Sequence, residues 1–273
     1  MDAACFPPFL IRRISVGIGR PELCYNPSVY PRTILGGLAA AAFILLLIPV
    51  FLVSFLLRIP GPLFAYSRVA LRAILAVAGI RADVSGRELF DRNGSYVFMS
   101  NHLSLIDGPL LFLLIPQPVR VIIKKQAFRI PVLGLSMLFA GFVPVDRKGA
   151  RQGRRAIDHA ARLMRAKGFS FLIFPEGTRS RDGRLQPFKR GGFFLALEAG
   201  APVVPVSVSG SFKVMRRGSP FIRPGRIRIR FHPPLEADTS NGDPAELMAR
   251  TREAVVSGLA EEESWTSGNT SGN

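Results

Sequence analysis

The amino-acid sequence predicts an α/β fold, with a mostly parallel central sheet flanked by helices and an N-terminal membrane-associated two-helix unit. From Arg81 onward, short β-rich runs alternate with helical patterns, which is typical of a parallel sheet. A long uncharged apolar run precedes this region. The chain has 273 residues, 48% of them hydrophobic, which is ample to bury one sizeable core.

The first 80 residues form the expected membrane-associated segment. Residues 33–57 carry no charge, and the run exceeds the roughly 20 apolar residues that span a bilayer. A signal peptide is disfavoured because its apolar core is usually only about 7–15 residues long. Pro49 leaves two arrangements open, a spanning helix and one bent to enter and leave a single leaflet. Residues 63–80 predict an amphipathic helix in the head-group region or packed on the following domain.

Residues 81–262 are expected to form the α/β domain. The tail, residues 263–273, is rich in Gly and Ser and is expected to be disordered. Helical patterns are expected near 105–114, 126–140, 151–167 and 191–199. The strand candidates are SYVFMS, VRVIIKK, FVPVDR, FSFLIFPEG, APVVPVSVSG and RIRIRFHPP.

The chain is strongly basic, with 36 Lys and Arg against 19 Asp and Glu, a net charge of +17. This charge predicts an anionic partner such as nucleic acid, phospholipid head groups or a phosphorylated substrate. The two cysteines, Cys5 and Cys24, have neither disulfide-framework nor zinc-site spacing, so no metal site is predicted. His159 lies in a basic helical pattern and His232 precedes two prolines, so both are expected at the surface.

The stretch NHLSLID places Asn101 and His102 just after a buried strand candidate, and Asp107 at the start of a helix. Ligands of α/β proteins gather at this end of a strand. Residues five apart on one helix point about 140° apart, so contact between His102 and Asp107 requires the strand-to-helix turn. With that turn, Asp107 accepts a hydrogen bond from one ring nitrogen and leaves the other free as a base. Otherwise the pair is an ordinary strand-end histidine and a helix-capping aspartate.

A second polar stretch, FPEGTRS, follows another buried strand candidate, and Pro175 ends that strand. The turn from Glu176 to Ser180 offers a carboxylate, a guanidinium and backbone amides to one ligand. Arg179 suits bidentate phosphate binding, and Arg147, Lys189 and Arg190 are further candidates for the same anion. A surface salt bridge between Glu176 and Arg179 is the structural alternative.

Together these motifs resemble those of the glycerolipid acyltransferases typified by lysophosphatidic acid acyltransferase. Asn-His, four residues and Asp at 101–107 match one motif, and FPEGTRS at 174–180 matches another. Two further blocks agree in order and spacing, KKQAFRIPVLGLSMLFAGFVPVDR and APVVPVSVSG. The resemblance covers about residues 80–235. Family members often carry an acidic residue and Leu shortly after the lysine, where this chain reads KKQAF, so the role of each lysine stays open.

The resemblance implies acyl transfer to the free hydroxyl of lysophosphatidic acid, giving phosphatidic acid. His102 would be the catalytic base, and Asp107 would orient and charge-balance its imidazolium. Glu176 would hold the glycerol portion of the acceptor or fix Arg179. No metal or cofactor is expected, because nothing in the sequence supplies a site for one. Acyl-CoA or acyl carrier protein (acyl-ACP) would enter as a co-substrate. The residues expected to bind substrate are Glu176, Gly177, Thr178, Arg179, Arg147, Lys124 and Lys125.

Two alternatives remain at this stage. The same chemistry could act on another lysophospholipid, dihydroxyacetone phosphate or an amino-acid lipid, and a non-catalytic basic membrane-binding module is the more remote reading. Nucleic acid is not an expected partner, because the aromatic residues near basic positions are mostly Phe in apolar runs. The expected partners are a lysophospholipid acceptor, an acyl thioester donor and membrane lipids. The expected location is the cytoplasmic face of a membrane, in keeping with a bacterial inner membrane.

Overall fold

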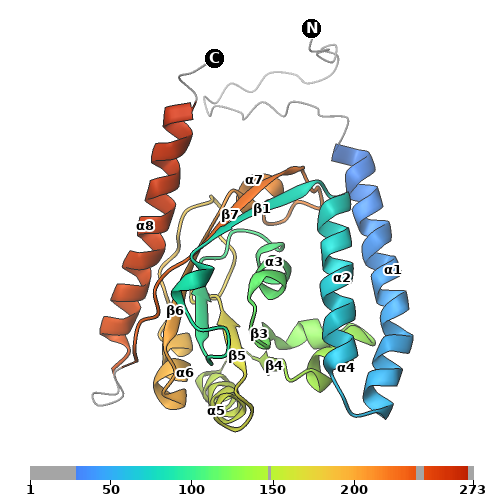
Figure 1. Ribbon diagram of the computed structural model, residues 1–273, viewed down its shortest axis with the longest axis horizontal. Coiled ribbons are helices and arrows are strands. Elements are labelled where there is room, and N and C mark those ends of the chain that lie inside the picture. Colours follow the sequence, from blue (N-terminus) through green and yellow to red (C-terminus); the bar gives the residue numbers. More distant parts are fainter. Residues whose placement is uncertain (1–28, 147–148, 238–242, 270–273) are drawn as a thin grey trace, which may run out of the picture.

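A seven-stranded sheet lies between two layers of helices (Figure 1). The computed structural model describes residues 29–146, 149–237 and 243–269. The strand order is β1-β7-β6-β2-β5-β3-β4, and every neighbouring pair is parallel except β6 and β7. The prediction of a mostly parallel sheet flanked by helices is therefore confirmed. The strands are β1 (Ile80–Ser85), β2 (Val97–Ser100), β3 (Val119–Lys124), β4 (Val143–Val145), β5 (Ser170–Ile173), β6 (Val203–Ser209) and β7 (Gly225–Phe231).

Two separate apolar cores cover the two faces of this sheet. Phe98 of β2 faces a core built with α2, α3 and α7, whereas its neighbours Val97 and Met99 face a core built with α5, α6 and α8. Successive residues of a strand point to opposite faces, and a sheet covered on both sides needs apolar residues at every position. The helices are α1 (Val29–Leu56), α2 (Gly61–Val77), α3 (Asp107–Leu114), α4 (Leu133–Phe139), α5 (Ala150–Lys167), α6 (Gly191–Ala199), α7 (Ser211–Val214) and α8 (Ala245–Asn269), with short 3₁₀ helices η1 (Arg87–Leu89) and η2 (Lys125–Arg129).

The N-terminal unit is an antiparallel pair of helices beside the sheet domain, and Figure 1 shows α1 and α2 lying side by side. Helix α1 is long and apolar enough to cross a membrane over Thr33–Leu56, judged by length and composition, and only 11% of that window is buried. It passes through Pro49 without interruption. The chain instead reverses at residues 57–60, where Arg58 has a φ of 56°. The bend considered at Pro49 is therefore absent.

Three helical segments differ from those expected. Helix α2 ends at Val77, because Gly79 adopts a φ of 70° and the chain then enters strand β1, which was not predicted. The helix expected near 126–140 is divided into η2 and α4, with Pro131 in the linking segment. Helix α8 was not predicted and continues to Asn269, into the segment expected to be disordered.

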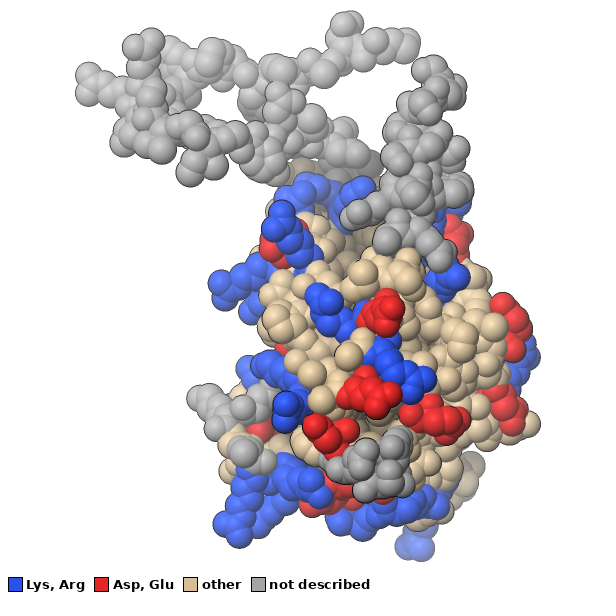
Figure 2. All heavy atoms as spheres, turned by 90° about the vertical axis from the view of Figure 1, so that its left-hand side faces the viewer, with Lys and Arg blue, Asp and Glu red and all other residues tan. Residues whose placement is uncertain are grey.

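The face of the molecule around α8 carries charges of both signs. Figure 2 shows the side of the molecule that carries α8, where basic and acidic side chains are interspersed. Ion pairs on this side include Arg250 with Glu246 on α8 itself. A surface of mixed sign does not by itself indicate a binding site for an anion.

Candidate active site

His102 and Asp107 meet at the carboxyl end of strand β2, as predicted. His102 Nδ1 lies 3.0 Å from Asp107 Oδ2, and the turn at 103–106 closes this contact before α3 begins. The Asp107 side chain is fully buried, while the His102 side chain keeps 18% exposure. With Nδ1–H donated to the carboxylate, His102 Nε2 is left as an acceptor, which is the arrangement of a general base.

The Asp107 carboxylate also holds the turn that carries His102. Its Oδ2 accepts hydrogen bonds from the backbone N–H of Leu103 and of Ser104, both at 2.7 Å. Asp107 therefore fixes both the ring and the backbone of the same loop.

Asn101 attaches this loop to the sheet. Its Nδ2 donates to the carbonyl of Val208 and its Oδ1 accepts from the Val208 N–H, both at 2.8 Å. The buried side chain thus pairs with strand β6 as another strand would. This contact explains why an asparagine precedes the histidine, a function that the sequence did not reveal.

Glu176 binds backbone groups with both of its oxygens. Oε1 accepts from the His102 N–H at 2.6 Å, and Oε2 accepts from the Gln186 N–H at 2.9 Å. The side chain is buried, and burial raises the pKa of Glu176 to about 7 despite these two bonds. In the structure Glu176 positions the backbone of His102. Its expected roles, holding the acceptor's glycerol portion or fixing Arg179, stay predictions.

The FPEGTRS turn packs directly against the histidine. The Phe174 ring stacks on the His102 ring with centroids 4.0 Å apart, and Ser180 donates its backbone N–H to the His102 carbonyl at 2.9 Å. Gly177 has a φ of 72°, a conformation that favours glycine and closes the turn onto the Phe174 carbonyl. The two motifs, more than 70 residues apart in sequence, form one loop cluster.

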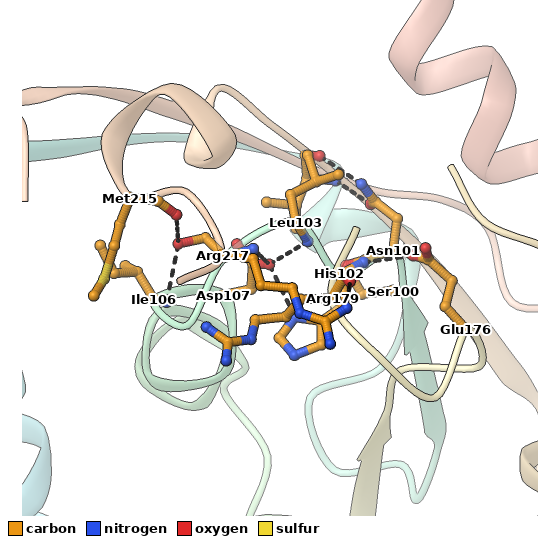
Figure 3. A network of polar contacts seen from close by, with 12 residues as sticks. Ser100, Asn101, His102, Leu103, Ile106, Asp107, Glu176, Arg179, Met215 and Arg217 are labelled. Atoms are coloured by element: carbon orange, nitrogen blue, oxygen red, sulfur yellow. Dashed lines mark hydrogen bonds and ion pairs between the residues drawn. The ribbon is translucent and has the colours of Figure 1, made fainter. Parts of the chain in front are cut away.

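Arg179 lies in this cluster together with an arginine that was not predicted. The Arg217 guanidinium donates to the Arg179 carbonyl at 2.9 Å, and Figure 3 shows both arginines within the network that contains His102 and Asp107. The loop bearing Arg217 is also tied to the histidine loop, because Ser104 Oγ donates to the Met215 carbonyl at 2.8 Å. No sequence signal separates Arg217 from the other arginines in its stretch.

The remaining expected ligands are spread around this centre. Thr178 is exposed at the tip of the turn. Lys124 lines the same cavity as His102, whereas the exposed Lys125 begins η2 and is not among the residues lining it. Arg147 lies outside the described residues. Within the described ranges, no three His, Cys, Asp or Glu side chains are grouped as metal ligands.

An apolar cavity of about 460 Å³ opens beside His102. Helices α1, α2, α3 and α4 and strand β3 supply its walls, so the N-terminal helix pair contributes directly to the site. Its size is within the range of small-molecule sites, and its composition suits an alkyl chain. The apolar side chains lining it include Phe43, Leu47, Phe64, Phe112, Met137 and Phe142.

The other two histidines differ from each other. His159 is exposed on α5, as expected. His232 is buried rather than at the surface, and its Nε2 lies 2.8 Å from Ser207 Oγ. The expectation for His232 was wrong because the two prolines after it do not prevent α8 from covering it, as its contact to Gly258 indicates.

The structure thus combines an α/β domain with a histidine–aspartate pair beside an apolar cavity. Residues 81–209 match the family model described as Acyltransferase. This part of the chain therefore belongs to the Acyltransferase family.

Similar proteins from plants and animals carry the name 1-acyl-sn-glycerol-3-phosphate acyltransferase. The chain is 33% identical to the one from Limnanthes douglasii over 63% of this chain and 61% of that protein. It is 39% identical to BAT2 of Brassica napus over 57% and 45%, and 30% identical to the alpha form of Ovis aries over 69% and 66%. The chain thus spans less than two thirds of these relatives' lengths.

The fold is similar to that of a solved structure described as the 1-acyl-sn-glycerophosphate (LPA) acyltransferase, PlsC, from Thermotoga maritima. The TM-score is 0.76 at 24% sequence identity, over 87% of this chain and 97% of the other. At this identity the similarity bears on the fold, and it extends to nearly the whole of that protein.

Proposed function

We propose that this protein transfers a fatty acyl group from a thioester donor to the free hydroxyl of lysophosphatidic acid, forming phosphatidic acid. The observation that carries the proposal is the position of His102. It is oriented by the buried Asp107 at 3.0 Å and borders an apolar cavity of about 460 Å³. A base beside a site for an alkyl chain is what acylation of a lipid hydroxyl requires.

The proposed reaction is a direct transfer. The acceptor hydroxyl attacks the thioester carbonyl while His102 Nε2 takes the hydroxyl proton, and the new C–O bond forms as the C–S bond breaks. The thiolate then leaves and takes the proton back from the imidazolium. Asp107 stabilises that imidazolium and keeps the ring in the required tautomer.

Both substrates are accommodated by the same loop cluster. The acyl chain occupies the cavity lined by α1, α2 and α4, and its thioester faces His102. The acceptor phosphate binds Arg179, with Lys124 at the cavity wall as a second candidate. Arg147, from the same family motif, stays a predicted phosphate ligand outside the described residues.

We further propose that the enzyme works on the cytoplasmic face of a membrane. Helix α1 exposes leucines along most of its length, for example Leu35, Leu45 and Leu56, and it also lines the cavity through Phe43. An enzyme embedded in this way takes an insoluble acceptor laterally from the lipid layer. Basic side chains near anionic lipid each add about 1 kcal/mol of attraction.

The test is acyl transfer by purified full-length protein in lipid or detergent, comparing wild type with His102→Ala. Lysophosphatidic acid is offered together with lysophosphatidylethanolamine, and both acyl-CoA and acyl-ACP are supplied. We expect phosphatidic acid from the wild type and a loss of about 10²–10⁴-fold in rate in the variant, the usual contribution of a general base. An unchanged melting temperature is the control for folding.

Other results would change the proposal in defined ways. Acylation of lysophosphatidylethanolamine alone would keep the mechanism and change the acceptor. Activity that survives the His102→Ala change would refute the assignment of the base. No activity on either acceptor with either donor, in folded protein, would favour the non-catalytic membrane-binding module.

A further inference from the structure

A second hollow, of about 530 Å³, lies beside α7 and the start of strand β7. Its wall begins at Gly210, one residue beyond the part of the chain that matches the family model. Gly210 has a φ of 81°, and a Cβ there would lie 2.5 Å from the Arg226 carbonyl. This glycine therefore lets α7 approach β7 closely, which shapes the hollow.

The lining of this hollow is strongly basic. Five cationic side chains contribute to it and, among its described lining residues, no carboxylate does. Arg226 is paired with Asp83 at 3.2 Å, but no described carboxylate forms an ion pair with Lys213, Arg216 or Arg223. This differs from the face in Figure 2, where both signs are interspersed. The cations are Lys213, Arg216, Arg223, Arg226 and Arg228.

One short segment of the chain, α7 and the loop after it, links the hollow to the active site. Helix α7 carries Lys213 on the hollow, and the next residues contact the histidine loop at Met215 and the Arg179 turn at Arg217. The segment returns to α7 where Arg223 donates its backbone N–H to the Val214 carbonyl at 2.8 Å. A ligand in the hollow is thus separated from His102 by α7 and its connecting loop.

We infer that this hollow binds the phosphate groups of a nucleotide thioester, so that the acyl donor is acyl-CoA. This inference rests on the proposed acyl transfer and names its donor. Coenzyme A places its pyrophosphate and 3′-phosphate at one end of a long flexible arm and the thioester at the other. With the thioester at His102, the arm passes α7 and the phosphates meet the cations of the hollow.

The concave shape favours a nucleotide over an acyl carrier protein. Clustered lysines and arginines lining a hollow of this volume suit a compact ligand with several phosphates. A carrier protein presents an extended acidic surface and a single phosphate on its arm. Such a partner needs an interface of larger area, and the deep cationic hollow would contribute little to it.

The experiment compares four donors with the same acyl group: acyl-CoA, acyl-3′-dephospho-CoA, acyl-4′-phosphopantetheine and acyl-ACP. The protein is the full chain in detergent, with saturating lysophosphatidic acid. The double variant Lys213→Ala/Arg223→Ala should raise the KM for acyl-CoA about tenfold or more, because each lost charged contact weakens binding. The KM for acyl-4′-phosphopantetheine, which keeps only one of these phosphates, should rise less. Arg252→Ala, an exposed arginine on α8, is the matched control and should behave as wild type.

Binding of 3′,5′-ADP, measured by calorimetry, provides a readout that does not require turnover. Wild type should bind it, and the double variant should bind at least about tenfold more weakly. Binding of this kind without acyl transfer from any donor would support the hollow and refute the proposed function. If the KM for each donor is the same in the variant as in the wild type, the hollow does not bind the phosphates of the donor, and the inference is refuted. Transfer from acyl-ACP alone, weakened in the variant, would also overturn it in favour of an acidic protein partner.

Discussion

Two histidines of this chain, His102 and His232, each lie beside a side-chain oxygen, yet only the first also borders the apolar cavity. His102 contacts the carboxylate of Asp107, keeps 18% exposure and borders the apolar cavity. His232 contacts the hydroxyl of Ser207 and is 6% exposed. The first lies at the carboxyl edge of the sheet, and the second lies beneath α8.

The two histidines are distinguished by the charge of their partner and by the access to the second ring nitrogen. Ser207 Oγ donates to the Val255 carbonyl at 2.9 Å, so it accepts from the His232 Nε2–H. That bond uses the only proton of a neutral ring, and burial lowers the pKa of His232 to about 4. His232 therefore links β6 to α8, whereas His102 has a carboxylate to stabilise its protonated form.

The largest effect is expected when the partner of His102 loses its charge. In Asp107→Asn, the amide oxygen still accepts from the Leu103 and Ser104 N–H groups, so the loop should keep its shape. The imidazolium loses its counter-charge, and we expect kcat to fall by about 10²–10⁴-fold with little change in the acceptor KM. Single-turnover kinetics measure this loss. A variant within tenfold of wild type would mean that the two histidines do not differ in the way described.

His232 should make the fold sensitive to acid. The folded pKa of about 4 lies below the ordinary value of 6.5, so the full contribution to stability is present above pH 6.5. As the pH falls from 6.5 towards 4, His232 binds a proton in the unfolded chain but stays neutral in the folded chain. We expect roughly 2–3 kcal/mol to be lost over this range. Denaturation at pH 7 and at pH 4.5 measures the free energy of unfolding. Between these pH values it should fall less in His232→Gln than in wild type, and an equal fall in both proteins would show that His232 is not its cause.

Glu176 should give the opposite dependence on pH. Its folded pKa of about 7 lies above the ordinary value of 4.5, so its protonated form is favoured by folding, and stability falls as the pH rises from 4.5 to 7. Glu176→Gln should flatten that slope. Because a glutamine has one acceptor oxygen for two N–H donors, it should also cost about 1–3 kcal/mol at pH 5 and reduce kcat about tenfold. Unchanged kcat would show that His102 does not need this support.

The smallest effect on activity is expected beneath α8. Ser207→Ala removes the acceptor of His232 and the donor to Val255, and should destabilise the fold by about 1–2 kcal/mol. The kcat should stay within about twofold of wild type, because neither residue faces the cavity. Melting temperature and initial rate together measure this separation. A large loss of rate would indicate that the α8 face takes part in catalysis.

Much of the sheet was predictable because its central strands are continuous apolar runs. The segments at β2, β5 and β6 are buried on both faces, and such runs are recognisable without knowledge of their partners. Strand β1 was missed because it lies at the edge of the sheet and exposes Arg81 and Asp83. It exists through pairing with β7, about 145 residues later in the chain, and no local pattern encodes that pairing.

The candidate site was predictable only where its residues are close together in the sequence. His102 and Asp107 are close in sequence, so their contact followed from one turn. Glu176 lies 74 residues from His102, whose backbone N–H it accepts. A backbone N–H is present at almost every residue, so the sequence does not mark it as a partner. Arg217 reaches Arg179 only because α7 follows β6 to the same edge of the sheet. Contacts of this kind depend on topology rather than on motif chemistry.

The place of helix α1 in the cavity wall has a practical consequence for how this protein can be handled. Phe43 and Leu47 of α1 line the same apolar cavity as His102, and Leu47 packs with Leu63 of α2 and Ala140 after α4. Removing the helix to make a water-soluble fragment would therefore open this cavity to solvent. In the proposed function, the helix that holds the protein in the lipid also forms one wall of the cavity for the acyl chain.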